Sequence, residues 1–141
     1  MVDIHIDYLG ELHCRAEHGP SRKLLETDAP VDNHGRGESY SPTDLLATAL
    51  GTCMATVMGI KARARGFDLE GMHVHVKKLM TTSQPRRVAR LEVSLRVPVQ
   101  VGERAGEAGR AELEHAANTC PVRLSLLDAI EVPVVFDWEL R

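Results

Sequence analysis

The chain has 141 residues, of which 43% are hydrophobic, and a formal net charge of −3 at pH 7, so a single domain covering residues 1–141 is expected. Its basic residues are scattered, which excludes the charged surface typical of nucleic-acid binders and of proteins bound to anionic membranes. Its amino terminus lacks the features of a secretion signal, and the uncharged part of its most apolar segment is shorter than the about 20 residues of a membrane span, so we expect a cytoplasmic protein.

Short strands are predicted in the amino-terminal third. Residues 2–9 alternate apolar and polar side chains, residues 11–17 alternate more weakly, and a third short strand is expected at residues 23–25. Residues 28–40 are rich in Pro, Asn, Asp and Gly, which is typical of a loop. The simplest arrangement is a three-stranded meander that leads through this loop into a helix.

The segment from Ser41 to Gly66 predicts a long apolar helix around which the rest of the chain is organised. Ser41 can cap this helix, with Pro42 in the first helical position and Asp44 as the return arm of a capping box. Between Asp44 and Lys61 no residue is charged, and apolar side chains recur every three or four residues. Gly66 supplies a left-handed stop. A helix with so little polar surface must be buried.

The rest of the chain predicts a hairpin, two helices and a closing strand. Residues 71–82 and 88–99 alternate as strands do, and helical spacing returns from about Glu103 to Asn118. A short helix is expected to start at Cys120, and residues 132–140 predict the closing strand. This order predicts an α+β fold with mainly antiparallel pairing.

The central helix also raises a packing problem. One small sheet of short strands cannot enclose a long helix that has no polar face. We therefore predict a homodimer, in which a second copy of the chain covers the remaining side of the helix.

Three cysteines carry the candidate chemistry. An odd number argues against a secreted disulfide framework and favours reduced or redox-active thiols. Cys53 lies in the middle of the central helix, where core packing alone would explain it. Cys120 lies at a predicted helix amino terminus, which should favour the thiolate and lower its pKa. If the short helix docks on the long one, the two sulfurs could meet and form a disulfide. Cys14 has no thiol partner by sequence pattern and is expected to be a packed bystander.

Two segments, taken together, resemble the OsmC-like branch of the OsmC/Ohr family of thiol-dependent peroxidases. They are GRGESYSPTDLLATALGTCMATVMGIKARARGF and the later NTCPVRLSL. The resemblance covers essentially the whole chain. It implies an OsmC-like intertwined homodimer, with antiparallel sheets wrapped around two long central helices and two active sites at the subunit interface. It also implies that Cys53 attacks the peroxide and that Cys120 resolves the product to a disulfide.

A peroxidatic thiol needs companions that stabilise a buried anion and hold the peroxide, and an arginine serves both needs. The family uses an arginine from the amino-terminal strands, oriented by a glutamate that commonly follows the proline at the start of the central helix. In this chain Thr43 occupies that acid position, and Asp44, which is equally a capping acid, follows it. Glu38 is the alternative orienting acid. The candidate arginines are Arg15, to which the resemblance points, Arg22 and Arg36.

The predicted function is therefore that of a cysteine-based hydroperoxide reductase, with organic hydroperoxides preferred over hydrogen peroxide. It needs no metal or organic cofactor, and an external dithiol, by resemblance a lipoyl-bearing protein, would reduce the disulfide. Apolar residues beside Cys53, such as Leu50 and Met54, would suit an apolar substrate tail and equally suit core packing. Two alternatives stay open: a non-catalytic OsmC-fold protein that binds a small ligand or has a structural role in stress, and a thiol redox sensor. His73 and His75 share one strand face without further ligands, so no metal site is predicted there.

Overall fold

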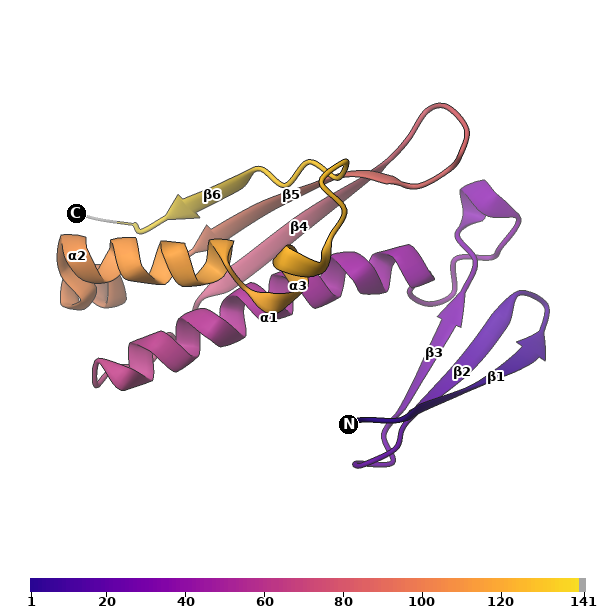
Figure 1. The fold of residues 1–141 in the computed structure, drawn as a ribbon, viewed down its shortest axis with the longest axis horizontal. Helices are drawn as coiled ribbons and strands as arrows, with labels where there is room; N and C mark the ends of the chain where they lie inside the picture. Colours follow the sequence, from indigo (N-terminus) through magenta and orange to yellow (C-terminus); the bar gives the residue numbers. More distant parts are fainter. Residues whose placement is uncertain (140–141) are drawn as a thin grey trace. The chain divides into compact units, whose positions relative to one another are not determined.

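The computed structural model describes residues 1–139, which fall into two compact units, residues 1–46 and the residues from 47 onward. Each unit contains one three-stranded sheet, and the second unit also contains the helices, apart from the first turn of α1 (Figure 1). The expected α+β class is confirmed.

The sheet of the first unit is an antiparallel meander, as predicted. It consists of β1 (Ile4–Gly10), β2 (His13–His18) and β3 (Leu24–Asp28), in that order across the sheet. The pairing of β2 with β3 places His13 directly opposite Asp28. The end of β3 and the start of β2 therefore lie side by side at the same end of this small sheet.

The loop after β3 folds back on itself around a short 3-10 helix, η1 (Val31–Asn33). The backbone N–H of Gly35 donates to the carbonyl oxygen of Pro30 at 3.1 Å, and that of Gly37 donates to the carbonyl oxygen of Ala29 at 3.3 Å. A Cβ atom at residue 35 would lie 1.7 Å from the Ala29 carbonyl oxygen. Glycine is therefore required at position 35 for the loop to close.

Helix α1 (Pro42–Ala64) begins and ends where the sequence predicts. The backbone N–H of Ser41 donates to Oδ2 of Asp44 at 2.8 Å, and the backbone N–H of Asp44 donates to Oγ of Ser41 at 3.1 Å. These two hydrogen bonds form the predicted capping box. Beyond the helix, Gly66 has φ of +84°, the left-handed conformation that glycine adopts without strain.

One face of α1 packs against the second sheet. Its buried residues are Ala47, Leu50, Gly51, Met54, Met58 and Ala62. A Cβ atom at residue 51 would lie 2.9 Å from Cγ2 of Val76, so Gly51 allows a close approach of helix and strand. The other face is exposed in the single chain, and Ile60 there is 63% exposed.

By length and composition alone, α1 could cross a membrane: an 18-residue window has a mean hydropathy of 1.5. The uncharged part of the helix is shorter than this window, because Asp44 and Lys61 bound it. The core helix of a soluble protein can have the same length and hydropathy.

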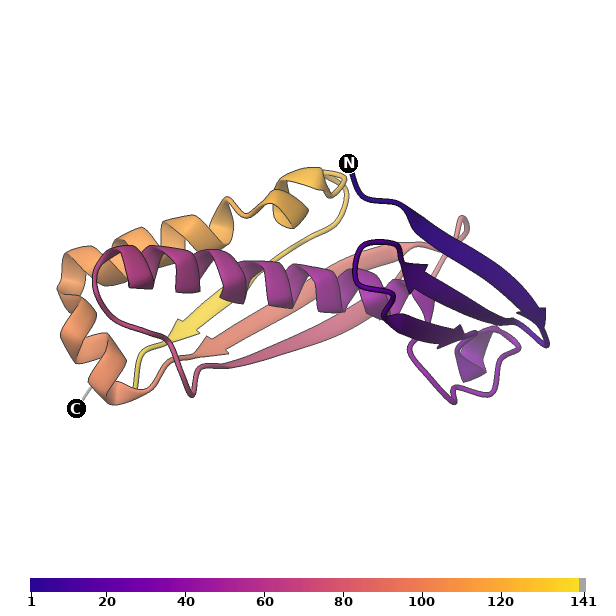
Figure 2. The ribbon, with the colours of Figure 1, turned by 90° about the horizontal axis from the view of Figure 1, so that it is seen from below.

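The second sheet has β5 (Val88–Arg96) in its centre, antiparallel to β4 (His73–Met80) and parallel to β6 (Val134–Asp137). The parallel pair departs from the mainly antiparallel pattern because α2 (Val99–Asn118) and α3 (Pro121–Ser125) carry the chain back to the same end of the sheet. The helices of this unit cover one face of the sheet (Figure 2).

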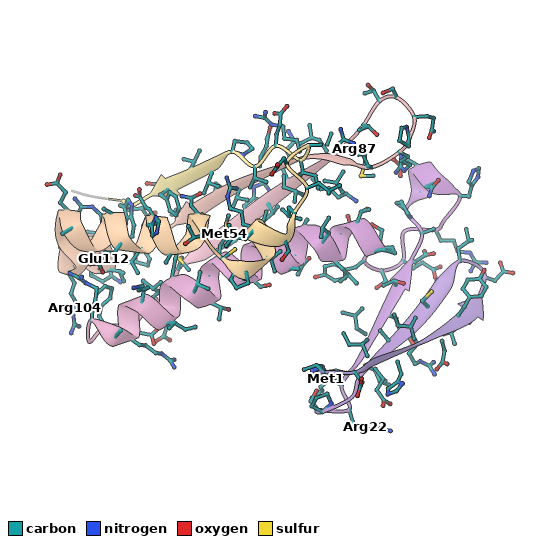
Figure 3. All side chains as sticks on the ribbon, in the orientation of Figure 1. Met1, Arg22, Met54, Arg87, Arg104 and Glu112 are labelled. Atoms are coloured by element: carbon teal, nitrogen blue, oxygen red, sulfur yellow. The ribbon has the colours of Figure 1, made fainter. Side chains whose placement is uncertain are left out.

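Helix α2 starts four residues earlier than the sequence pattern indicates. Gly106 has φ of +65° and ψ of 177°, and this non-helical residue divides α2 into two helices at a kink. Arg65, at the end of α1, pairs with Glu112 of α2 at 2.9 Å, and Nη2 of Arg104 donates to the Gly66 carbonyl oxygen at 2.8 Å (Figure 3). These contacts fasten the end of α1 to α2. The predicted closing strand extended to residue 140, which lies outside the described residues.

Candidate active site

Cys120 occupies the N-cap position of α3, so the helix starts one residue later than the sequence pattern predicts. Its Sγ accepts a hydrogen bond from the backbone N–H of Arg123 at 3.5 Å, and the residue is only 1% exposed. The Arg123 guanidinium in turn donates to the carbonyl oxygen of Val132 at 3.1 Å, which ties α3 to the segment before β6. The Cys120 side chain is thus buried and positioned by a backbone hydrogen bond.

Cys53 lies in the middle of α1 and is partly buried. Its side chain contributes to the raised pKa of Cys120, so the structure brings two thiols that are remote in sequence near each other. Both are free thiols, as is Cys14. Because both residues belong to the second unit, their contact is set by the packing of α1 and α3 within that unit.

The pKa of the Cys120 thiol is raised, chiefly by burial, and the nearby Cys53 side chain raises it further. The backbone N–H of Arg123 acts in the opposite direction. The N–H groups at the helix amino terminus thus lower this pKa as expected, but burial outweighs them and the net shift is upward. The dipole of a five-residue helix does not offset the cost of removing a thiolate from water.

The apolar residues near Cys53 belong to the core. Leu50 and Met54 are fully buried (Figure 3 labels Met54), so of the two explanations for them the structure favours packing. An open hollow of about 340 Å³ lies elsewhere, beside α3. It is lined by Arg123, Leu124, Leu126, Leu127, Asp128, Ile130 and Val132. Arg123 connects this hollow to Cys120 through its backbone hydrogen bond to the sulfur.

The candidate arginines all lie in the first unit, and each is paired with an acid. Nε of Arg15, on β2, lies 3.3 Å from Oε1 of Glu26. Arg22 pairs with Glu17, and Arg36 lies 3.7 Å from Glu11 and 3.9 Å from Glu38. The acid that orients Arg15 in this structure is thus Glu26, which sequence reasoning missed because it depends on the register between β2 and β3.

The two candidate acids have separate surroundings. Asp44 forms both arms of the capping box at the start of α1. The Glu38 carboxylate lies 3.3 Å from Nε2 of His13, and the backbone N–H of Glu38 donates to Oδ2 of Asp28 at 3.0 Å. That N–H group is the main reason that the pKa of Asp28 is lowered, while a hydrogen bond to the Glu11 carbonyl oxygen is the main reason that the pKa of His13 is raised.

The residues expected to be bystanders show no arrangement that suggests chemistry. Cys14 is half-buried on β2, opposite Tyr8 on one side and Thr27 on the other. His73 and His75 are exposed on β4.

Comparison with known proteins identifies the family. The family model described as OsmC-like protein matches residues 35–135. A crystal structure from Psychrobacter arcticus, of a protein whose name refers to osmotic stress induction and a detoxification response, is 38% identical, with a TM-score of 0.87 and coverage of 96% of each chain. No curated protein was found to match the sequence.

More distant solved structures share the fold. An organic hydroperoxide resistance protein OsmC from Legionella pneumophila is 16% identical, with a TM-score of 0.70 over 97% of this chain and 96% of that one. The organic hydroperoxide resistance protein OhrB of Bacillus subtilis is 10% identical, with a TM-score of 0.67 over 96% and 97%. With the family model covering most of the sequence and a close structural relative covering nearly all of it, this chain belongs to the OsmC-like protein family.

Proposed function

We propose that this protein is a cytoplasmic thiol-dependent peroxidase that reduces organic hydroperoxides, with Cys53 as the nucleophile and Cys120 as the resolving thiol. The observation that carries the proposal is the proximity of these two side chains, which is close enough for Cys53 to raise the pKa of Cys120. Membership of a family whose structural relatives include organic hydroperoxide resistance proteins supports the reaction class.

The reaction proceeds in two steps on the protein. The Cys53 thiolate attacks one peroxide oxygen, so that an S–O bond forms, the O–O bond breaks, and the departing alkoxide takes a proton to become an alcohol. The Cys120 sulfur then attacks the sulfur of the Cys53 sulfenic acid, which forms the disulfide and releases water. An external dithiol, for which we propose a lipoyl-bearing protein, restores both thiols by exchange.

The electrostatics of the pair support this division of roles. The raised pKa of Cys120 favours its protonated form, as suits the thiol that acts in the second step. Cys53 is therefore the sulfur proposed to attack the peroxide.

Arg15 is the proposed guanidinium for the peroxide, because a fixed fork of donors on β2 can hold an anion while Glu26 orients it. Asp44, which follows the family's acid position, and Glu38, in the loop before α1, remain the proposed orienting acids. Replacing Arg15 with Lys tests the assignment, since the charge is retained and the fork is lost. We expect a lower kcat/KM for this variant, and an unchanged value for the matched Arg22→Lys variant.

The exposed leucines in the hollow beside α3 support the proposed substrate class. The walls of this hollow contain three leucines and one isoleucine, and Leu124 and Leu127 are 71% and 69% exposed. Such a surface gains free energy by covering an apolar substituent of an organic hydroperoxide. We expect Leu124→Asp to raise the KM for cumene hydroperoxide and to leave the rate with hydrogen peroxide unchanged.

A homodimer is proposed from the open face of α1. This face carries Thr52, Thr56 and Ile60, and only 33% of the most apolar window of the helix is buried within the single chain. The hydroxyl groups of Thr52 and Thr56 donate to carbonyl oxygens of their own helix, at 2.7 and 2.8 Å, so burying this face would leave neither hydroxyl unpaired. Light scattering should give the mass of two chains, and Thr56→Arg should yield a single chain.

Thiol titration before and after one equivalent of cumene hydroperoxide tests the peroxidase proposal. We expect two thiols per chain to disappear without crosslinks between chains, followed by sustained turnover with a dithiol. Unchanged thiols would instead indicate a ligand-binding or structural protein. A disulfide without sustained turnover would indicate a redox sensor.

A further inference from the structure

A second cluster of reactive side chains lies in the first unit. It consists of His13 at the start of β2, Asp28 at the end of β3, and Glu38 in the loop that precedes α1. One ligand atom from each residue, a ring nitrogen or a carboxylate oxygen, lies within 4.8 Å of the other two. We propose that these three residues bind a divalent first-row transition cation, such as Zn²⁺, through Nε2 of His13 and one carboxylate oxygen each from Asp28 and Glu38.

Two of the three spacings between the ligand atoms are near those expected for such an ion. Nε2 of His13 lies 3.3 Å from Oε2 of Glu38 and 3.6 Å from Oδ1 of Asp28. Metal–ligand bonds of about 2.0–2.1 Å in a tetrahedral site place neighbouring ligand atoms about 3.3–3.4 Å apart. A contact of 3.6 Å, in contrast, is too long for a direct hydrogen bond between the imidazole and Asp28.

Oδ1 of Asp28 is the independent observation that points to a ligand. This oxygen is buried without a hydrogen-bond partner, on a side chain that is 0% exposed, and it faces Nε2 of His13. A buried carboxylate oxygen that accepts no hydrogen bond is costly, because the imidazole at 3.6 Å replaces the lost water only as a nearby charge. A cation bound between Asp28, His13 and Glu38 would satisfy it.

The surrounding hydrogen bonds orient the ligands as they do in metal sites. Nδ1 of His13 lies 2.8 Å from the carbonyl oxygen of Glu11, so the ring donates there and turns Nε2 toward the two carboxylates. The other oxygen of Asp28 accepts from the backbone N–H groups of Arg36 and Glu38, at 3.2 and 3.0 Å. In His13 and in Asp28, one polar atom is thus hydrogen-bonded to the backbone, and the other polar atom faces the cluster.

The chemistry of the three ligands favours a transition cation over Ca²⁺ or Mg²⁺. Those harder ions prefer an all-oxygen shell, whereas an imidazole nitrogen suits zinc, iron, nickel and copper. The Glu38 side chain is 57% exposed. Water can therefore complete the coordination on that side, which makes this an open site.

Calorimetric titration of the full-length protein with Zn²⁺ alone tests the inference. Because the Cys53–Cys120 pair could also bind Zn²⁺, the titration is repeated on the Cys53→Ser/Cys120→Ser double variant. We expect both proteins to bind one ion per chain at the cluster, and Glu38→Gln and His13→Gln to weaken that binding more than about tenfold. His18→Gln and Glu26→Gln, at the other end of β2 and on β3, are matched controls that should bind as the parent does.

Two outcomes would overturn the inference. One is a titration in which the double variant binds no ion, since the thiols would then be the only site. The other is undiminished binding by Glu38→Gln, an exposed substitution that does not threaten folding. Co²⁺ provides a second readout: visible d–d bands without a thiolate charge-transfer band are expected, and these bands should be lost in His13→Gln.

Discussion

The clusters of reactive side chains in the two units differ in their chemistry and in their surroundings. In the second unit, Cys53 and Cys120 meet within a largely apolar core, where burial sets the pKa of Cys120. In the first unit, His13, Asp28 and Glu38 meet at a sheet edge, where backbone N–H and carbonyl groups set the direction of each pKa shift. Burial thus dominates the pKa shift in the thiol pair, and hydrogen bonds from the backbone dominate the shifts in the His13 cluster. A substitution in one cluster should therefore leave the other unaffected.

The largest expected effect is on the thiol pair. Cys53→Ser should lower peroxide consumption by at least about 10³-fold, because a serine hydroxyl at neutral pH is not a comparable nucleophile. Consumption of cumene hydroperoxide in the presence of a dithiol measures it. Cys14→Ser is the matched control and should retain activity. Full activity in Cys53→Ser would show that the nucleophile lies elsewhere.

Cys120→Ser should separate the two steps of the same chemistry. We expect the first turnover to persist and Cys53 to accumulate as sulfinic acid under excess peroxide, because no thiol captures the sulfenic acid. Mass spectrometry of the Cys53 peptide checks this. If sulfenic acid resolves at the parental rate in this variant, Cys120 is not the resolving thiol.

Gly35→Ala should damage the first unit. A Cβ atom would lie 1.7 Å from the Ala29 carbonyl oxygen, so the loop must open, and the N–H groups of Arg36 and Glu38 would leave Asp28. We expect a loss of about 1–3 kcal/mol in the free energy of unfolding, measured with urea. His34→Gly is the control in the same loop: residue 34 has φ of +69°, so glycine should be tolerated. Equal stabilities would contradict the tight loop.

Asp44→Ala should have a smaller effect, about 1 kcal/mol, because it removes one arm of the capping box of α1. Asp44→Asn should cost less, since its amide oxygen can still accept from the Ser41 N–H. Thermal unfolding of both variants measures the difference. A fall in kcat/KM for Asp44→Asn that exceeds its effect on stability would assign the carboxylate to catalysis as well.

The smallest expected effect is a pH dependence that belongs to the thiol pair. The folded-state pKa of Cys120 lies above its ordinary value of 9.0. The corresponding stabilisation is complete below the unfolded-state pKa, and it disappears as the pH rises through the higher folded-state pKa. The free energy of unfolding should therefore fall at alkaline pH, and it should fall less in Cys120→Ser. A parallel decline in both proteins would show that other groups cause it.

The features that were predicted from the sequence are those that depend on residues close together along the chain. The capping box at Ser41, the uncharged run of α1 and the stop at Gly66 all follow from neighbouring residues, and the structure has each of them. The short helix after α2 was also predicted, with its start one residue too early. The amino-terminal meander followed in the same way from alternation and turns.

What escaped prediction depends on tertiary placement. The parallel pairing of β6 and the contact of Cys53 with Cys120 require knowledge of how α2 and α3 return the chain to the sheet. The raised pKa of Cys120 requires its burial. The pairing of His13 with Asp28 requires the register of β2 and β3, which the β2–β3 turn alone did not disclose.

The parallel strand β6 has a mechanical consequence for the redox pair. It is attached to β5 by backbone hydrogen bonds, among them those from Val93 to Pro133 and from Val97 to Asp137, and Arg123 ties α3 to Val132 just before it. Loss of the β5–β6 hydrogen bonds would therefore loosen one attachment of α3, at whose amino terminus Cys120 lies.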